Sequence, residues 1–269
     1  MGNTLNYVAF GLYPYFCVTV FLVGSWIRFD REQYTWRSGS SQLLRRRLLV
    51  WGSILFHAGV LTVLAGHFVG MLTPIAVFGA IGISHSFKQG MAIVIGGVAG
   101  LACFAGISLL TYRRLFDARI RRTSSFGDIA VLVLLFAQLL LGLATIPVSL
   151  QHMDGEEMVK FMSWAQGLVI FRPDVAGLVA HVSPVFKVHL FLGMTLFLVA
   201  PFTRLVHIWS APVWYLGRRG YQVVRAARPG SRSPFHSAGS GGLAVPTISQ
   251  PGAASAGSFA ARVADREVR

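Results

Sequence analysis

The chain has 269 residues, of which 54% are hydrophobic and only 13% are charged. A soluble domain of this length would carry about 25% charged residues, so this composition is that of a membrane protein. The net charge of +14 does not indicate binding to nucleic acid, because the basic residues stand at the ends of long apolar runs, where they orient a protein in the bilayer.

Five apolar segments are long enough to cross roughly 30 Å of hydrocarbon as helices. In chain order they cover approximately residues 5–27, 48–72, 91–112, 127–150 and 185–210. The segments are continuous rather than alternating, which predicts helices and not the strands of a barrel. The first segment contains Pro14 and has no cleavage motif after a basic start, so we interpret it as a retained helix. The predicted fold is all-α, a polytopic bundle of five transmembrane helices.

Positive charge is concentrated in alternate connections. Six arginines lie between residues 28 and 47, five between 113 and 122, and four between 218 and 228. The second connection has Lys88 as its one full positive charge, and the fourth balances its basic residues with acidic ones. Because Lys and Arg accumulate on the cytoplasmic side, the N-terminus is predicted outside and the C-terminus inside.

The chain divides by composition into a membrane domain and a tail. Residues 1–227 hold the five segments, and we expect a short interfacial helix in the fourth connection, residues 151–184. Residues 228–269 are rich in Pro, Gly, Ser and Ala, with few large apolar side chains to bury. We therefore predict a disordered cytoplasmic tail.

Four of the eight histidines lie inside the predicted helices. His57 and His67 are on the second helix, and His189 and His207 are on the fifth. For one histidine in hydrocarbon, a hydrogen bond to a neighbouring helix is about as good an explanation as metal ligation. Two on each of two helices favour four axial ligands for two b-type haems, each haem held by two imidazoles.

Topology predicts how these histidines pair. The second and fifth helices are antiparallel, so His57 and His207 lie near the inner ends, and His67 and His189 lie nearer the outside. The spacings of ten and eighteen residues correspond to about 15 Å and about 27 Å along straight helices, a mismatch that the sequence does not resolve. A single four-histidine zinc site is excluded, because all ligands would have to come within about 2 Å of one ion.

Glycines accompany these histidines. Those on the second helix are Gly59, Gly66 and Gly70, and those on the third are Gly96, Gly97 and Gly100. Such small residues serve either close helix packing or clearance for a bulky cofactor. For the glycines flanking His67 we favour clearance; for the third helix both interpretations stay open.

Several sequence motifs resemble those of one family. They are YPY at 13–15, GSW at 24–26, QYTWR at 33–37, LFH at 55–57, GHF at 66–68, GMLTP at 70–74, QHMDG at 151–155, WAQ at 164–166, GMTLF at 193–197 and RLVHIWS at 204–210. Together they resemble the gamma subunit of membrane-bound respiratory nitrate reductases, over nearly the whole chain to about Tyr221. The tail after Arg228 departs from that family.

The resemblance implies a five-helix, di-haem cytochrome b of the bacterial cytoplasmic membrane. Such a subunit oxidises quinol (menaquinol or ubiquinol) near the outer haem and passes electrons inward to an iron–sulfur beta subunit, which feeds a nitrate-reducing alpha subunit with a molybdenum cofactor. The family's axial ligands fall on His57 and His207 for the inner haem and on His67 and His189 for the outer haem. A lysine important for quinol oxidation falls on Lys88.

On this basis we expect a quinol pocket near His67, Gly70 and Lys88, with the protons released outside. The alternative for Lys88 is an interfacial lysine whose amine reaches towards water, and His85 is a weaker candidate for a proton acceptor. Arginines at the inner helix ends are candidates to pair with the carboxylates of the inner haem, and otherwise anchor the membrane interface. These are Arg113, Arg114 and Arg204.

Two other functions compete with this interpretation. The first is a di-haem quinone-linked subunit of a different reductase, of the sulfur-compound or heterodisulfide type, which would share the same ligand chemistry. The second is a transporter or assembly protein whose histidines relay protons. A haem spectrum separates the second from the first, and only the soluble partner separates the first from a nitrate reductase.

Overall fold

The computed structural model describes residues 2–32, 34, 36 and 46–210. These residues form helices and no strand, which confirms the all-α class. The predicted tail at residues 228–269, its boundary at 227, the four arginines between 218 and 228 and most of the first connection lie outside the described residues. The orientation of the termini across the membrane stays a prediction.

Within the described residues, five helices are long and apolar enough to span a membrane, which confirms the predicted architecture. These spans are Thr4–Arg31, Arg47–Leu72, His85–Phe116, Phe126–Leu150 and Pro184–Phe202. The main helices inside them are α2 (Tyr13–Arg31), α3 (Arg46–Leu72), α5 (His85–Phe116), α7 (Phe126–Leu150) and α10 (Pro184–Val199). Before α2 come α1 (Gly2–Tyr7) and the π-helical turn η1 (Val8–Leu12).

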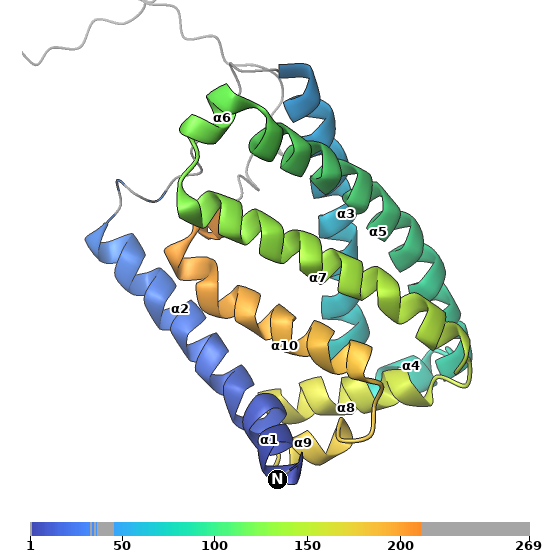
Figure 1. Ribbon diagram of the computed structural model, residues 1–269. Coiled ribbons are helices and arrows are strands. Elements are labelled where there is room, and N and C mark those ends of the chain that lie inside the picture. Colours follow the sequence, from blue (N-terminus) through green and yellow to red (C-terminus); the bar gives the residue numbers. More distant parts are fainter. Residues whose placement is uncertain (1, 33, 35, 37–45, 211–269) are drawn as a thin grey trace, which may run out of the picture. The chain divides into compact units, whose positions relative to one another are not determined.

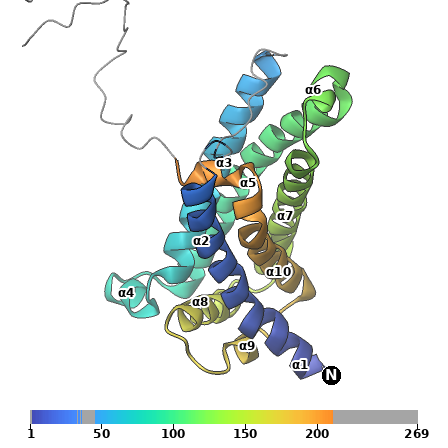
Figure 2. The same ribbon diagram turned by 90° about the vertical axis from the view of Figure 1, so that its left-hand side faces the viewer.

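Shorter elements lie at the ends of these helices. They are α4 (Ile75–Ala80), α6 (Ala118–Arg122), α8 (Glu156–Val169), α9 (Val175–Leu178) and the 3-10 turns η3 (Ala200–Phe202) and η4 (Arg204–Ile208). The short helix expected in the fourth connection is α8. Figures 1 and 2 show α4, α8 and α9 at one end of the bundle and α6 at the opposite end.

The long helices pack in the order α2, α10, α7, α5 and α3 (Figure 1). The third span is longer than predicted, because Ser84 accepts a hydrogen bond from the Phe87 amide and starts α5 at His85 instead of residue 91. Lys88, predicted in the connection, therefore lies in the first turn of α5. The fifth span differs too, since α10 ends at Val199 instead of continuing to residue 210.

A buried cluster closes the end of the bundle that carries α8. Trp164 is 2% exposed, and its indole Nε1 donates a hydrogen bond of 2.9 Å to the carbonyl of Phe10. The Gln166 amide of the same helix donates to the carbonyls of Met71 (3.0 Å) and Thr73 (2.9 Å). These carbonyls lie at the C-terminal end of α3, where no further amide of the helix is available to donate to them. α8 therefore fixes both the first span and the end of α3.

Close packing of α3 against α5 depends on glycine. A Cβ atom added at Gly59 would lie 2.5 Å from the Ala99 carbonyl oxygen, and one at Gly106 would collide with the backbone nitrogen of Phe56. Gly59 thus serves helix packing. On α5, Gly100 does the same, because its Cβ would lie 2.8 Å from Leu143 Cδ2. By contrast, a Cβ at Gly66 or Gly70 would meet no described neighbouring helix within 4 Å, which is compatible with clearance.

Gly59→Ala is expected to destabilise the protein, because the added carbon forces α3 away from α5. Overpacking of this kind costs about 1–3 kcal/mol, which exceeds the gain of about 0.5–1 kcal/mol that alanine brings to a helix interior. Thermal unfolding in detergent would measure the effect. Gly97→Ala is the matched control, because its Cβ would make ordinary contact at 3.7 Å with Ile146. An equal unfolding temperature for both variants would contradict the packing role of Gly59.

Candidate functional site

The four intramembrane histidines form two facing pairs. The ring centroids of His57 and His207 are 6.3 Å apart, and those of His67 and His189 are 6.2 Å apart. α3 carries His57 and His67, α10 carries His189, and η4 carries His207. The structure therefore brings together the same partners that helix topology pairs.

The separation within each pair fits one metal ion between two imidazoles. An imidazole nitrogen binds a first-row metal at about 2 Å, and it lies about 1 Å from the centre of its own ring. Two rings on opposite sides of one ion would therefore have centroids about 6 Å apart. Both pairs have this spacing. Within the described residues, no three His, Cys, Asp or Glu side chains converge on one point, so each pair stands as a separate two-histidine site.

Hydrogen bonds select the nitrogen that is free to bind a metal. Nδ1 of His57 lies 2.8 Å from the Ser53 carbonyl, and Nδ1 of His67 lies 2.8 Å from the Val63 carbonyl. Nδ1 of His207 lies 2.6 Å from the Arg204 carbonyl. A carbonyl oxygen only accepts, so each Nδ1 carries the proton and each Nε2 keeps a lone pair. Metal-binding histidines are typically oriented in this way.

His189 is held differently. It packs against α7, where a Cβ atom at Gly142 would lie 3.0 Å from His189 Cε1. Its backbone carbonyl accepts a hydrogen bond of 3.1 Å from the Gln138 side chain. Its Nδ1 is buried and makes no hydrogen bond to the described residues. Gly142 and Gln138 are thus site residues that sequence reasoning missed; a glycine and an amide in the middle of the apolar run of α7 were the available signals.

The end of α10 explains how two histidines ten residues apart on α3 can face two histidines that are eighteen residues apart in the sequence. From His189 to the helix end at Val199 is ten residues, the same as from His57 to His67. The chain then leaves the helix through η3, an extended Thr203 (φ −126°, ψ −177°) and η4. The predicted continuous helix to residue 210 is wrong, and this break returns His207 to the level of His57.

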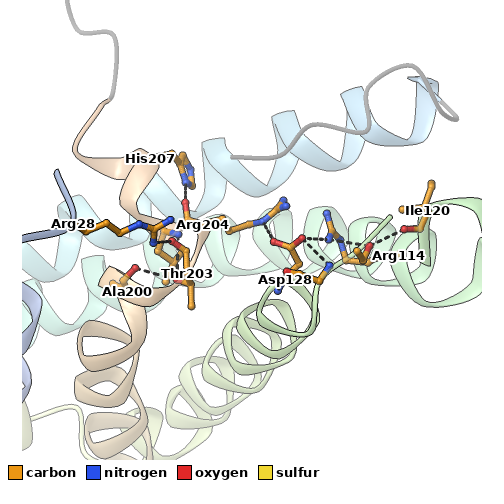
Figure 3. Close-up of polar contacts among 11 residues, drawn as sticks. Arg28, Arg114, Ile120, Asp128, Ala200, Thr203, Arg204 and His207 are labelled. Atoms are coloured by element: carbon orange, nitrogen blue, oxygen red, sulfur yellow. Dashed lines mark hydrogen bonds and ion pairs between the residues drawn. The ribbon is translucent and has the colours of Figure 1, made fainter. Parts of the chain in front are cut away.

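Polar contacts hold this break in place (Figure 3). The Arg28 guanidinium of α2 donates to the carbonyls of Pro201 (2.6 Å) and Thr203 (3.0 Å). Arg204 Nε lies 2.6 Å from Asp128 Oδ1. Asp128 lies in the first turn of α7 and was missed by the sequence reasoning, although Ser125 and Asp128 have the spacing of a capping box.

Two of the three predicted inner arginines share this carboxylate. Arg114 Nη1 lies 3.2 Å from Asp128 Oδ2, and Arg204 binds the other oxygen. Arg113, the third, is 3% exposed in the last turn of α5. All three lie towards the end of the bundle that holds the His57/His207 pair. Their predicted contacts with haem carboxylates stay predictions.

Lys88 is buried at the opposite end and is 7% exposed. Its Nζ donates to the carbonyl of Gly70 (2.7 Å), contacts Met162 Sδ (2.8 Å) and lies 3.7 Å from the centre of the Phe78 ring. The amine is therefore not extended towards water, as the interfacial alternative required. Gly70 lies three residues after His67 on α3, so the structure brings the three expected pocket residues to one region.

Phe78 and Met162 were not expected beside Lys88; Phe78 comes from the short helix α4, and Met162 comes from α8, 74 residues further along the chain. His85, the weaker candidate, is exposed at the start of α5. The described residues thus form two histidine pairs, a cationic end near His207 and a buried amine beyond His67.

Comparison with known proteins gives consistent results. The sequence pattern of the family described as nitrate reductase gamma subunit matches residues 6–227. The chain is 50% identical over 222 residues to the respiratory nitrate reductase 1 gamma chain of Escherichia coli K12, covering 82% of this chain and 98% of that protein. It is 49% identical over 228 residues to the respiratory nitrate reductase 2 gamma chain of the same organism, covering 85% and 100%. The nitrate reductase gamma chain of Bacillus subtilis 168 is 41% identical over 218 residues, covering 81% and 97%.

Proposed function

Because the chain belongs to the nitrate reductase gamma subunit family and is a membrane subunit of a respiratory nitrate reductase, we propose that its histidine pairs hold two b-type haems. His57 and His207 would be the axial ligands of the inner haem, and His67 and His189 those of the outer haem. When bound, the haems supply one-electron transfer. The observation that carries the proposal is the spacing of 6.2–6.3 Å in both pairs.

Quinol oxidation is assigned to the end of the bundle that holds Lys88. An ammonium group has three N–H donors. Two are directed at Gly70 and Met162, and the Phe78 ring covers the remaining side. A quinol oxygen that displaced the weakly accepting sulfur of Met162 would gain a charge-assisted hydrogen bond close to His67. Lys88 would then orient the quinol and stabilise the negative charge that develops on the quinol oxygen as the quinol hydroxyl loses its proton.

Charge distribution supports an orientation for this transfer. The arginine-rich helix α6 and Arg113, Arg114 and Arg204 lie at the His57/His207 end. Lys and Arg excess marks the cytoplasmic side of a membrane protein. We therefore assign His57 and His207 to the cytoplasmic half of the bacterial cytoplasmic membrane, next to an iron–sulfur beta subunit that delivers electrons to a molybdenum-containing alpha subunit. Protons from quinol would leave on the outer side.

The test is a spectrum of the purified complex. We expect a reduced-minus-oxidised b-type absorption band, two haems per chain, and iron–sulfur and molybdenum subunits that co-purify. A chain without a b-type band, or with one haem, would contradict the proposal. Reoxidation of the reduced haems by nitrate distinguishes this function from the alternative of a di-haem subunit serving a sulfur-compound or heterodisulfide reductase, whose haems nitrate would not reoxidise.

A further inference from the structure

His207 is the one histidine of the two pairs that does not lie on a long helix. It sits in the five-residue turn η4, which follows η3 and the extended Thr203. The Nδ1 of His57 likewise lies 2.8 Å from a carbonyl one turn earlier, that of Ser53, but Ser53 belongs to the 27-residue helix α3. Short 3-10 turns have poor hydrogen-bond geometry and little stability of their own. The position of His207 therefore depends on contacts from other helices.

One such contact comes from Asp128 at the start of α7 (Figure 3). Its Oδ1 accepts a hydrogen bond of 2.6 Å from Arg204 Nε. Arg204 in turn uses its backbone carbonyl to hold His207 Nδ1 at 2.6 Å. The side chain of Arg204 is thus fixed to α7, while its backbone fixes the imidazole. Asp128 and His207 are joined through a single residue.

Asp128 is itself rigidly placed. It is the third residue of α7, and it forms a capping box in which the Ser125 hydroxyl accepts from the Asp128 amide and Asp128 Oδ2 faces the Ser125 amide at 3.3 Å. A carboxylate in the first turn is also favoured by the helix dipole. The side chains of Asp128 and Arg204 are 18% and 25% exposed, so water screens this pair less than it would a surface ion pair.

The charge of Asp128 has a second effect. Its carboxylate lies between the guanidinium groups of Arg114 and Arg204. Without this carboxylate, the two partly buried guanidinium groups would repel each other. Arg204 would be driven away from α7, and the Arg204 carbonyl that orients His207 would move with it.

We propose that Asp128 is a positioning residue for the inner pair: through Arg204 it fixes the tautomer and the ring orientation of His207. This inference rests on the proposed function of the pair as axial ligands of a haem. Asp128 does not touch the reacting atoms, and its removal acts on the geometry of the site instead of the chemistry of the quinol.

The experiment compares three variants of the intact complex with the wild type. Asp128→Asn keeps the size and one acceptor oxygen but removes the charge, and Asp128→Glu restores the carboxylate. Ser125→Ala removes only the hydroxyl that caps α7; it leaves the Ser125 amide that faces Asp128 Oδ2 and the Asp128–Arg204 pair. The measurements are haem content per chain and the electron paramagnetic resonance signal of each oxidised haem, which depends on the angle between its two imidazoles. That angle is 70° for His57/His207 and 48° for His67/His189.

For Asp128→Asn we expect at least half of the inner haem to be lost or its resonance to shift, with the outer haem unchanged. Asp128→Glu should recover most of the native signal, and Ser125→Ala should retain it. A native inner signal at full occupancy in Asp128→Asn would overturn the inference, and so would equal loss of both haems, which indicates general unfolding. A wild type without two haems would instead refute the proposed function, so the two failures are distinguishable.

Discussion

His67→Leu is expected to remove the outer haem and to abolish nitrate reduction driven by quinol. His67 is exposed on an apolar stretch of α3 and faces His189, so leucine fits the surface of the helix but provides no ligand. Loss of a partner that merely orients a ligand costs about 10–100-fold in metal affinity or activity, and loss of the ligand itself should exceed that. The measurements are haem content per chain and the rate of nitrate reduction with a quinol donor.

His152→Leu is the matched control for this prediction. The Nδ1 of His152 lies 3.1 Å from the Val148 carbonyl, four residues earlier, which is the hydrogen-bond pattern of His67. His152 belongs to neither pair, so its replacement should leave both haems and quinol oxidation in place. Two haems per chain in His67→Leu would contradict the assignment of His67 as a ligand, whatever the activity.

Much of the fold follows from the sequence, because hydropathy and helix geometry decide it. Long apolar runs need helices to satisfy their backbone in lipid, and antiparallel crossing then decides which histidine meets which. The grouping of Lys88 with Gly70 and His67 rests instead on the family resemblance. Hydropathy and a simple topology were sufficient for the helices and for the pairing of the histidines.

The end of α10 could not be located from hydropathy, because residues 199–202 are as apolar as the helix before them. Pro201 was the signal that pattern reasoning passed over. Proline supplies no amide hydrogen and disfavours helical geometry in the residue before it, so helices tend to end or bend there. The unequal spacing of the histidines was a second sign that one of the two helices is interrupted.

The remaining site residues depend on contacts between distant parts of the chain. Asp128 and Arg204 are 76 residues apart, and Lys88 and Met162 are 74 apart. Neither pair leaves a pattern in the sequence. Glycine shows the same limit: Gly59 and Gly66 look alike in sequence, yet the first faces α5 and the second faces no described neighbour. The two glycines are seven residues apart and lie on nearly the same side of α3, so which of them meets another helix is decided by packing along the length of α3.

Lys88→Met is expected to lower kcat/KM for quinol by about 10- to 100-fold, since a hydrogen bond to a charged group contributes about 1.5–3 kcal/mol. Methionine matches the length of lysine and tolerates burial beside Met162 and Phe78, so α5 should stay folded. Both haems should be retained, because Lys88 contacts neither histidine pair in the described residues. The measurements are steady-state kinetics with a soluble quinol analogue and the haem spectrum of the same preparation.

Two comparisons test the role of Lys88: one between electron donors, and one between variants of two different lysines. Reduced viologen, a small one-electron donor that carries no quinol hydroxyl, should support nitrate reduction equally in Lys88→Met and the wild type. Lys160→Met is the matched lysine control, because Lys160 lies on α8, pairs with Glu157 at 3.0 Å and is 42% exposed. Unchanged quinol kinetics in Lys88→Met would show that Lys88 does not bind the quinol and only donates a structural hydrogen bond to the Gly70 carbonyl. A loss confined to the quinol donor, in a preparation that keeps both haems, places the defect at quinol oxidation and not in the nitrate-reducing subunits.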